Sequence, residues 1–193
     1  MSRTANEKRP GELRAAIVRY LVRHGLTGLS LRPLAKAVGS SPRVLLYYFG
    51  SKEKMVIEVL AEVRQRQRAS FGGVRAASFA EECRIVWKQM SAGDSEPLFR
   101  LFFEAYGMAL RRPRVYKEFL RATIEDWLQL IAEPLRSEGC SQREARAFAT
   151  VVLDGLRGFM LDYCTTHERK RVDRAADLWL GTLDSMVPDR KED

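Results

Sequence analysis

Apolar residues recur at every third or fourth position along most of the chain, which is the spacing of one face of an α-helix. No segment shows the strict alternation of apolar and polar residues that is typical of a β-strand. The pattern predicts an all-α fold of about nine helices: three small ones, a connector, and then a five-helix bundle. The predicted helices cover residues 10–25, 31–38, 42–48, 51–72, 79–90, 98–110, 113–139, 141–167 and 172–187.

Residues 30–54 have the pattern of two short helices joined by a tight turn and followed by the start of a third. Ser30, Ser41 and Ser51 stand where each helix begins, and a serine hydroxyl can accept a hydrogen bond from a free amide of the first turn. Gly39 suits the turn, because glycine enters the left-handed region without strain. This arrangement is typical of the helix-turn-helix, whose second helix can lie in the major groove of DNA.

Positive charge is concentrated in the same part of the chain. Residues 1–54 contain eleven Lys/Arg and three Asp/Glu, whereas residues 55–193 contain 22 of each. A basic module that faces duplex phosphates gains affinity from counterion release. A basic face that is simply solvated is the alternative. We favour DNA binding because the charge coincides with the helix-turn-helix, and we predict a DNA-binding domain at 1–54 and an effector-binding and dimerisation domain at 55–193.

Bulky apolar side chains are concentrated in the second predicted domain, where they indicate either an ordinary core or a mostly apolar ligand cavity between helices. The candidate cavity residues are Trp87, Met90, Phe102, Phe103, Tyr106, Trp127, Phe159 and Tyr163. The candidates for polar groups that orient a small-molecule effector are Glu104, Tyr106, Asp126 and Asp162. Each of these four can instead be a solvated or salt-bridged helix residue.

The last two predicted helices carry apolar residues on more than one face, so they need a second contact. They are either central in the bundle or in contact with a partner subunit. We favour a two-fold homodimer, because two helix-turn-helix domains placed one or more helical turns of DNA apart can read a two-fold DNA site. The candidate interface residues are Phe148, Val151, Gly155, Gly158, Trp179, Leu183 and Met186.

The segment from Leu13 to Leu60 resembles the tetracycline-repressor (TetR) family of bacterial transcription regulators. The similar pieces are the apolar pattern of the first helix, LSLRPLAKAVGSSP, VLLYYF and SKEKM. The resemblance implies a dimer that binds a palindromic operator in double-stranded DNA and releases it when a small molecule enters the C-terminal bundle. It also implies DNA contacts from Ser30, Arg32, Ser41, Pro42, Arg43, Val44, Tyr47, Tyr48 and Lys52.

Two residues depart from the family pattern. Arg43 stands where family members often have a small residue, and we expect it to read a guanine through a bidentate hydrogen bond to O6 and N7. Leu46 stands where a tyrosine is common, so one phosphate contact is lost. Arg3, Lys8 and Arg9 can form a minor-groove arm, although loose phosphate contact is the preferred interpretation.

Other function classes have weaker support. A helical interaction module that binds RNA or an acidic protein is the first alternative, and a thiol enzyme is the second. The possible nucleophiles and bases are Cys83, Cys140, Cys164, His24 and His167, but no phosphate loop, nucleophile elbow or paired metal ligands accompany them. We therefore expect no enzymatic activity, no cofactor and no metal. The odd number of cysteines and the absence of an apolar leader or membrane-spanning run indicate a cytoplasmic protein with reduced thiols.

Overall fold

The computed structural model describes residues 10–93 and 95–187. Within these ranges it contains helices and no strand, so the predicted all-α fold is confirmed. The helices are α1 (Pro10–His24), α2 (Leu31–Ala37), α3 (Pro42–Phe49), α4 (Lys52–Phe71), α5 (Phe79–Met90), α6 (Glu96–Arg111), α7 (Pro113–Ser137), α8 (Gln142–Thr166), α9 (Arg169–Leu180) and α10 (Leu183–Met186). The helix predicted over residues 172–187 is two helices, because the chain turns at Gly181 and Thr182.

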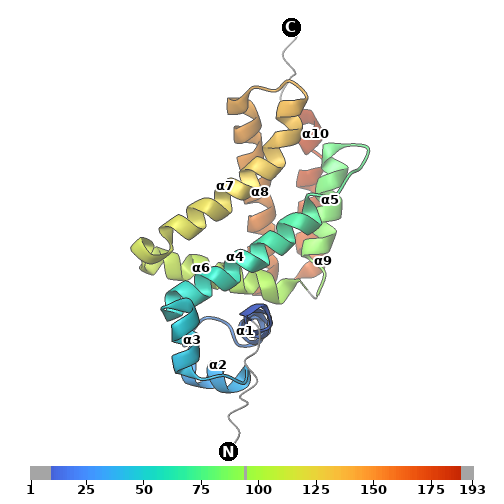
Figure 1. Ribbon diagram of the computed structural model, residues 1–193. Helices are drawn as coiled ribbons and strands as arrows, with labels where there is room; N and C mark the ends of the chain where they lie inside the picture. Colours follow the sequence, from blue (N-terminus) through green and yellow to red (C-terminus); the bar gives the residue numbers. More distant parts are fainter. Residues whose placement is uncertain (1–9, 94, 188–193) are drawn as a thin grey trace, which may run out of the picture.

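Helices α1 to α3 form a head at one end of the molecule, the end at which the chain begins (Figure 1). Ser41 and Ser51 cap α3 and α4, since each hydroxyl accepts a hydrogen bond from the amide three residues on, at 3.2 Å and 3.1 Å. Ser30 holds the corresponding position before α2 but makes no side-chain cap bond, so this predicted cap is wrong. Gly39 has a φ of +68°, as the predicted turn requires.

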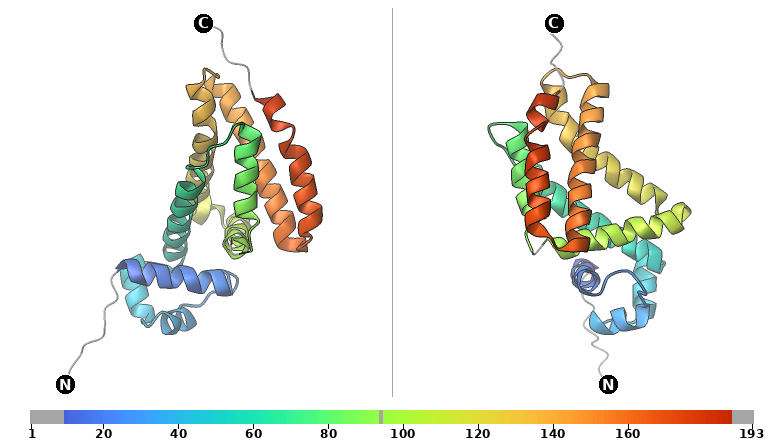
Figure 2. Two further views of the ribbon diagram at one scale, coloured as in Figure 1. Left: turned by 90° about the vertical axis from the view of Figure 1, so that its right-hand side faces the viewer. Right: turned by 180° about the vertical axis from the view of Figure 1, so that it is seen from behind.

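Helix α4 leaves the head and runs into the bundle, while α6 lies crosswise between the two (Figures 1 and 2). The first buried residues of α4, from Met55 to Val63, belong to the same apolar cluster as α1, α2 and α3. Leu101 and Phe102 of α6 and Tyr116 of α7 join that cluster too. The core of the head is therefore continuous with the nearest helices of the bundle. The boundary at residue 54 stays a prediction and falls in the first turn of α4.

A second buried cluster holds the far part of the bundle together. It is formed by residues of α5 and α7 to α10, with Trp87, Leu128, Met160 and Leu180 among its buried members. Helices α7 and α8, of 25 residues each, pack against each other near the turn that joins them and diverge toward their other ends (Figures 1 and 2). In the described ranges, no helix is both long and apolar enough to cross a lipid bilayer.

Candidate functional site

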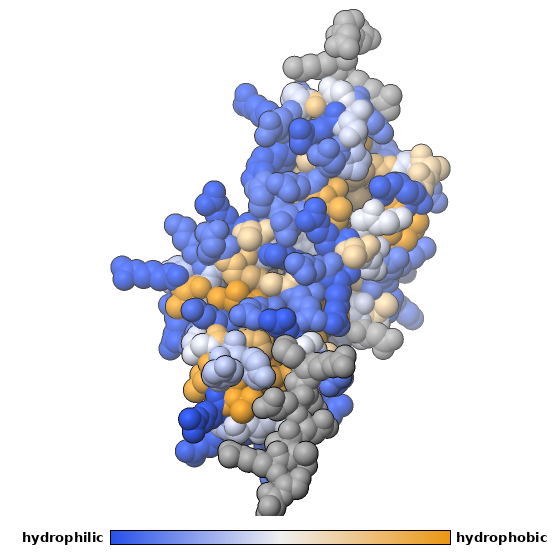
Figure 3. Space-filling view, viewed as in Figure 1, coloured by the Kyte–Doolittle hydropathy of each residue, from blue (hydrophilic) through white to orange (hydrophobic). Residues whose placement is uncertain are grey.

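Helix α3 exposes the side that was predicted to face the DNA groove. Leu45 and Phe49 are buried in the head core, whereas the opposite side of the helix is open to solvent, and Tyr47 is 83% exposed. The predicted DNA-contacting residues that are exposed are Ser30, Arg32, Ser41, Arg43, Val44, Tyr47 and Tyr48, while Pro42 and Lys52 are half-buried. Figure 3 shows hydrophobic and hydrophilic side chains mixed over this end of the molecule. Such a surface can contact both thymine methyl groups and polar base edges.

Three cations of the helix-turn-helix have no ion-pair partner among the described residues. Arg32, Lys36 and Arg43 are exposed, and none forms an ion pair with any residue that the structure describes. Since they lie on α2 and α3, these cations are placed on both helices of the helix-turn-helix. Phosphate oxygens of a duplex can supply the missing anionic partners.

Lys52 is positioned by the head itself. Its Nζ donates a hydrogen bond to the carbonyl oxygen of Leu29 at 3.2 Å, which holds the ammonium group against the loop between α1 and α2. An ammonium group has three donors, so two remain for a phosphate.

Tyr47 and Tyr48 meet edge to face with their ring centres 5.5 Å apart. The predicted arm residues Arg3, Lys8 and Arg9 lie outside the described residues.

A cavity of about 670 Å³ opens between α4, α5, α6, α7 and α8. Small-molecule sites typically measure roughly 300–1,000 Å³ and are lined mostly by apolar side chains. The predicted cavity residues that line it are Met90, Phe102, Phe103, Tyr106 and Trp127. The apolar lining residues that sequence reasoning missed include Phe71, Phe79, Phe99, Ile131 and Leu156.

Three predicted cavity residues do not line it. Trp87 donates a hydrogen bond from Nε1 to Asp173 Oδ1 at 3.0 Å and packs its ring on Phe159, at 6.0 Å between ring centres. Phe159 in turn packs on Trp179 at 5.5 Å. Tyr163 is buried in the core of the same helices. These aromatic residues join α5, α8 and α9, so their role is to hold the bundle together.

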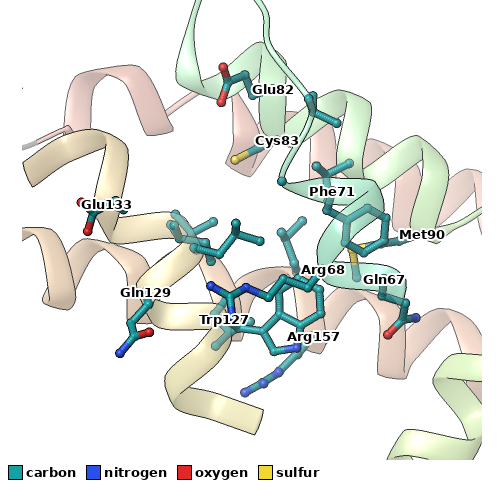
Figure 4. A pocket seen from close by; sticks show the side chains of 18 of the residues that line it. Gln67, Arg68, Phe71, Glu82, Cys83, Met90, Trp127, Gln129, Glu133 and Arg157 are labelled. Atoms are coloured by element: carbon teal, nitrogen blue, oxygen red, sulfur yellow. The ribbon is translucent and has the colours of Figure 1, made fainter. Parts of the chain in front are cut away.

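Two of the polar residues that line the cavity, Arg157 and Tyr106, contact each other, and Figure 4 shows Arg157 beside Trp127. Arg157 of α8 is only 22% exposed, and its guanidinium lies over the ring of Tyr106 at 5.5 Å. Burial lowers the pKa of Arg157 from its ordinary value and raises the pKa of Tyr106. The Tyr106 hydroxyl is buried and has no hydrogen-bond partner in the described chain. The available signal for Arg157 was its position on an otherwise apolar stripe, between Leu153 and Met160.

The other polar candidates act elsewhere. The carboxylate of Glu104 accepts hydrogen bonds from backbone amides in the loop between α1 and α2. Asp126 pairs with Arg64 at 3.3 Å, and Asp162 pairs with Arg171. None of these three carboxylates lines the cavity. Of the four polar candidates, Tyr106 alone is part of it.

The predicted interface residues divide into two groups. Phe148 and Leu183 are buried within the chain. Gly155 faces Trp179 so closely that a Cβ there would lie 2.4 Å from the indole Cζ2. The remaining three, Val151, Gly158 and Met186, are exposed. The residues with intrachain partners, Phe148, Gly155, Trp179 and Leu183, therefore have a structural role inside the subunit that the sequence pattern did not separate from an interface.

The thiols do not have the surroundings of nucleophiles. All three cysteines are buried. Burial raises the pKa of Cys83 to about 12 and that of Cys164 to about 11, whereas a reactive thiolate needs a lowered pKa. His24 packs against Tyr20, and His167 lies 3.5 Å from Glu96. Among residues 10–93 and 95–187, no group of His, Cys, Asp or Glu is arranged to hold a metal ion.

Comparison with known proteins agrees with this geometry. Residues 13–59, which span α1 to most of α4, match the sequence model of bacterial regulatory proteins of the tetR family. No protein of curated function matches the sequence. A transcriptional regulator from Rhodococcus sp. Rha1 has the same fold, with a TM-score of 0.75 and 21% identity over 90% of this chain and 95% of that one.

Two further solved structures share the fold. GusR of Salmonella enterica gives a TM-score of 0.72 at 16% identity, over 91% of this chain and 94% of that chain. A TetR transcriptional regulator from Legionella pneumophila gives a TM-score of 0.69 at 14% identity, over 92% of this chain and 98% of that chain. At these identities the likeness concerns the fold. Residues 13–59 therefore carry the sequence pattern of bacterial regulatory proteins of the tetR family, and the chain as a whole shares the fold of solved transcriptional regulators.

Proposed function

We propose that the protein is a ligand-responsive repressor, which binds a palindromic operator as a homodimer and releases it when a small, mostly apolar molecule fills the cavity. The observation that carries the proposal is the position of Phe102. Of the residues described, only Phe102 both lines the cavity and belongs to the buried cluster of the head. A ligand in the cavity therefore contacts a side chain that also packs in the DNA-binding core.

Two helices supply the mechanical link. Helix α4 carries head-core residues in its first half and the lining residues Gln67, Arg68 and Phe71 in its last turns. Helix α6 carries the lining residues Phe103 and Tyr106. An effector shifts DNA affinity only if it binds two arrangements of the protein differently. A change in the angle of α4 or α6 would alter the spacing of the paired heads. We propose that the DNA-binding and the ligand-bound arrangements differ in this angle.

Exposed apolar side chains on the last helices support a dimer. Val151 and Leu161 of α8 are 40% and 46% exposed, and Leu178 of α9 is 78% exposed. Met186 of α10 is also exposed. A two-fold axis near α8 and α9 would bury these residues against their copies. The proposed interface thus keeps Val151, Gly158 and Met186 and adds Leu161 and Leu178.

Mapping of genomic fragments that the purified protein retains tests this function. We expect a small set of duplex sites with two-fold symmetry, and an affinity that falls steeply as salt rises. A single-stranded competitor should displace the protein poorly, which separates the proposal from an RNA-binding module. Indifference to every duplex fragment at low and moderate ionic strength would disprove it.

A further inference from the structure

The cavity contains a cation whose donors the protein leaves free. Arg157 forms no hydrogen bond to any described residue, and its single ion pair, with Asp154, is long at 3.8 Å. Asp154 lies on the outer side of α8, on the face that also carries Val151, Gly158 and Leu161, and 67% of its side chain is exposed in the single subunit. An arginine stays charged in proteins and offers five N–H donors in a planar fork. The Arg157 side chain is thus mostly buried, yet its guanidinium nitrogens have no hydrogen-bond acceptor in the described chain and are available to an anion.

The nearest polar neighbour adds a further donor. Because burial raises the pKa of Tyr106, its hydroxyl keeps its proton and can donate. The ring of Tyr106 lies 5.5 Å from the Arg157 guanidinium carbon, and its hydroxyl has no partner in the described part of the chain. A buried donor without an acceptor is costly, and a ligand oxygen would remove that cost. Both side chains therefore have donors that a ligand oxygen could satisfy.

The other arginines that line the cavity are more exposed to solvent than Arg157. Arg136 pairs with Glu133 at 3.2 Å, and Arg75 donates to backbone carbonyls of its own loop. Arg68 lies 3.9 Å from Asp126. In Figure 4, Glu82 and Glu133 are well separated from Arg157, so negative charge lies on the far side of the cavity. This distribution suits a ligand with one anionic end and an uncharged remainder.

We infer that the effector is an apolar monocarboxylate, whose carboxylate binds the guanidinium of Arg157 and the hydroxyl of Tyr106. This inference rests on the proposed function and specifies its ligand. A carboxylate matches the guanidinium fork with two parallel hydrogen bonds. The apolar body lies among the aromatic and aliphatic lining residues, among them Phe71, Phe103, Trp127 and Ile131.

The test compares head groups on fixed apolar bodies. Decanoate, 4-tert-butylbenzoate and 2-naphthoate are each titrated beside the matching alcohol and the matching amine, with binding measured by calorimetry. We expect at least one carboxylate to bind about tenfold or more tightly than its alcohol, and its amine to bind more weakly still. If no carboxylate in the panel binds better than its alcohol, the inference is wrong.

Variants assign the preference to the proposed residues. Arg157→Met should abolish the carboxylate preference, and Tyr106→Phe should reduce carboxylate affinity several-fold and alcohol affinity less, because a charged acceptor forms the stronger hydrogen bond. Arg136→Met is the matched control, because Arg136 lines the same cavity but is already paired. A preference that survives Arg157→Met, or that Arg136→Met removes equally, contradicts the assignment. Circular dichroism verifies that each variant is folded.

A parallel arm keeps this inference separate from the regulator function. DNA binding is measured by fluorescence anisotropy with a retained genomic duplex, with and without the best carboxylate. Intact DNA binding without a carboxylate preference overturns the ligand class alone. A carboxylate that binds through Arg157 but leaves DNA affinity unchanged overturns its role as an effector. Failure to bind any duplex overturns the repressor function, whatever the cavity binds.

Discussion

The carboxylate of Glu104, on α6, accepts a hydrogen bond from the backbone N–H of Leu26, 78 positions earlier in the sequence. The same oxygen accepts a bond from the N–H of Thr27 at 3.1 Å. These bonds tie the loop that leads into the helix-turn-helix to a helix whose neighbouring residues, Phe103 and Tyr106, line the cavity. The contact is thus a second route, besides α4, by which the bundle can position the head.

Glu104→Ala should loosen this connection. Two backbone donors lose a charged acceptor, and we expect a loss of about 1–3 kcal/mol in the free energy of unfolding, measured by urea denaturation. Glu104→Gln retains one acceptor oxygen and should cost less. We also expect Glu104→Ala to weaken the effect of ligand on DNA binding more than it weakens ligand binding. An unchanged ligand effect together with unchanged stability would contradict this role.

Glycines on α8 offer a matched pair of substitutions. Gly155→Ala should destabilise the protein by about 1–3 kcal/mol, because the new Cβ would overlap the ring of Trp179. Gly158→Ala meets nothing within 4 Å in the subunit and should stabilise the helix of the single subunit by about 0.5–1 kcal/mol, apart from any contact across the proposed interface. Chemical denaturation at one protein concentration measures both. Equal effects at the two positions would contradict the packing of α9 on α8.

Arg43 and Lys52 should affect DNA binding in different ways. Arg43→Ala should relax the preference at one base pair by about 1–3 kcal/mol, in a binding-site selection compared with the native protein. Lys52→Ala should weaken binding to all DNA sequences alike and reduce the salt dependence of the affinity. Because Lys52 also holds Leu29, its variant needs a check of thermal stability. An unchanged base preference in Arg43→Ala would remove the proposed reading of guanine.

The cysteines should resist alkylation in the folded protein. With the pKa of Cys83 raised to about 12, almost no thiolate exists at neutral pH, and the rate should rise with pH only well above the ordinary value of 9.0. Iodoacetamide labelling followed by mass spectrometry at pH 7 to 10 measures this. The unfolded protein in guanidinium is the control and should react with all three thiols. Labelling of Cys83 in the folded state as fast as in the control would contradict the burial.

The head could be predicted from sequence because its signals are local. The serines before α3 and α4, the glycine in the turn and the apolar face of each helix all act within a few residues. The cavity is different, since whether an aromatic side chain lines it depends on which helices meet. Trp87 and Trp127 look alike in the sequence, yet Trp87 bonds to Asp173 of α9 and Trp127 faces the cavity.

The same limit applies to glycine and arginine. Gly155 and Gly158 lie three residues apart, and only the position of Trp179 distinguishes a packing site from a position that is open within the subunit. Arg157 had a visible signal in its apolar stripe, but its lack of hydrogen-bond partners becomes apparent only when α6 is placed beside α8. Long-range placement, which periodicity does not encode, decides these roles.

In the 20-residue helix α4, the residues that pack in the core of the head and the residues that line the cavity are different ones. Positions 55–63 supply the head core, and positions 67, 68 and 71 supply the cavity wall. Under the proposed function, natural variation at those last three sites would change which chemical is sensed while the recognised nucleotide sequence is conserved. An ancestral protein of this shape could thus acquire new inducers without rewiring the genes under its control.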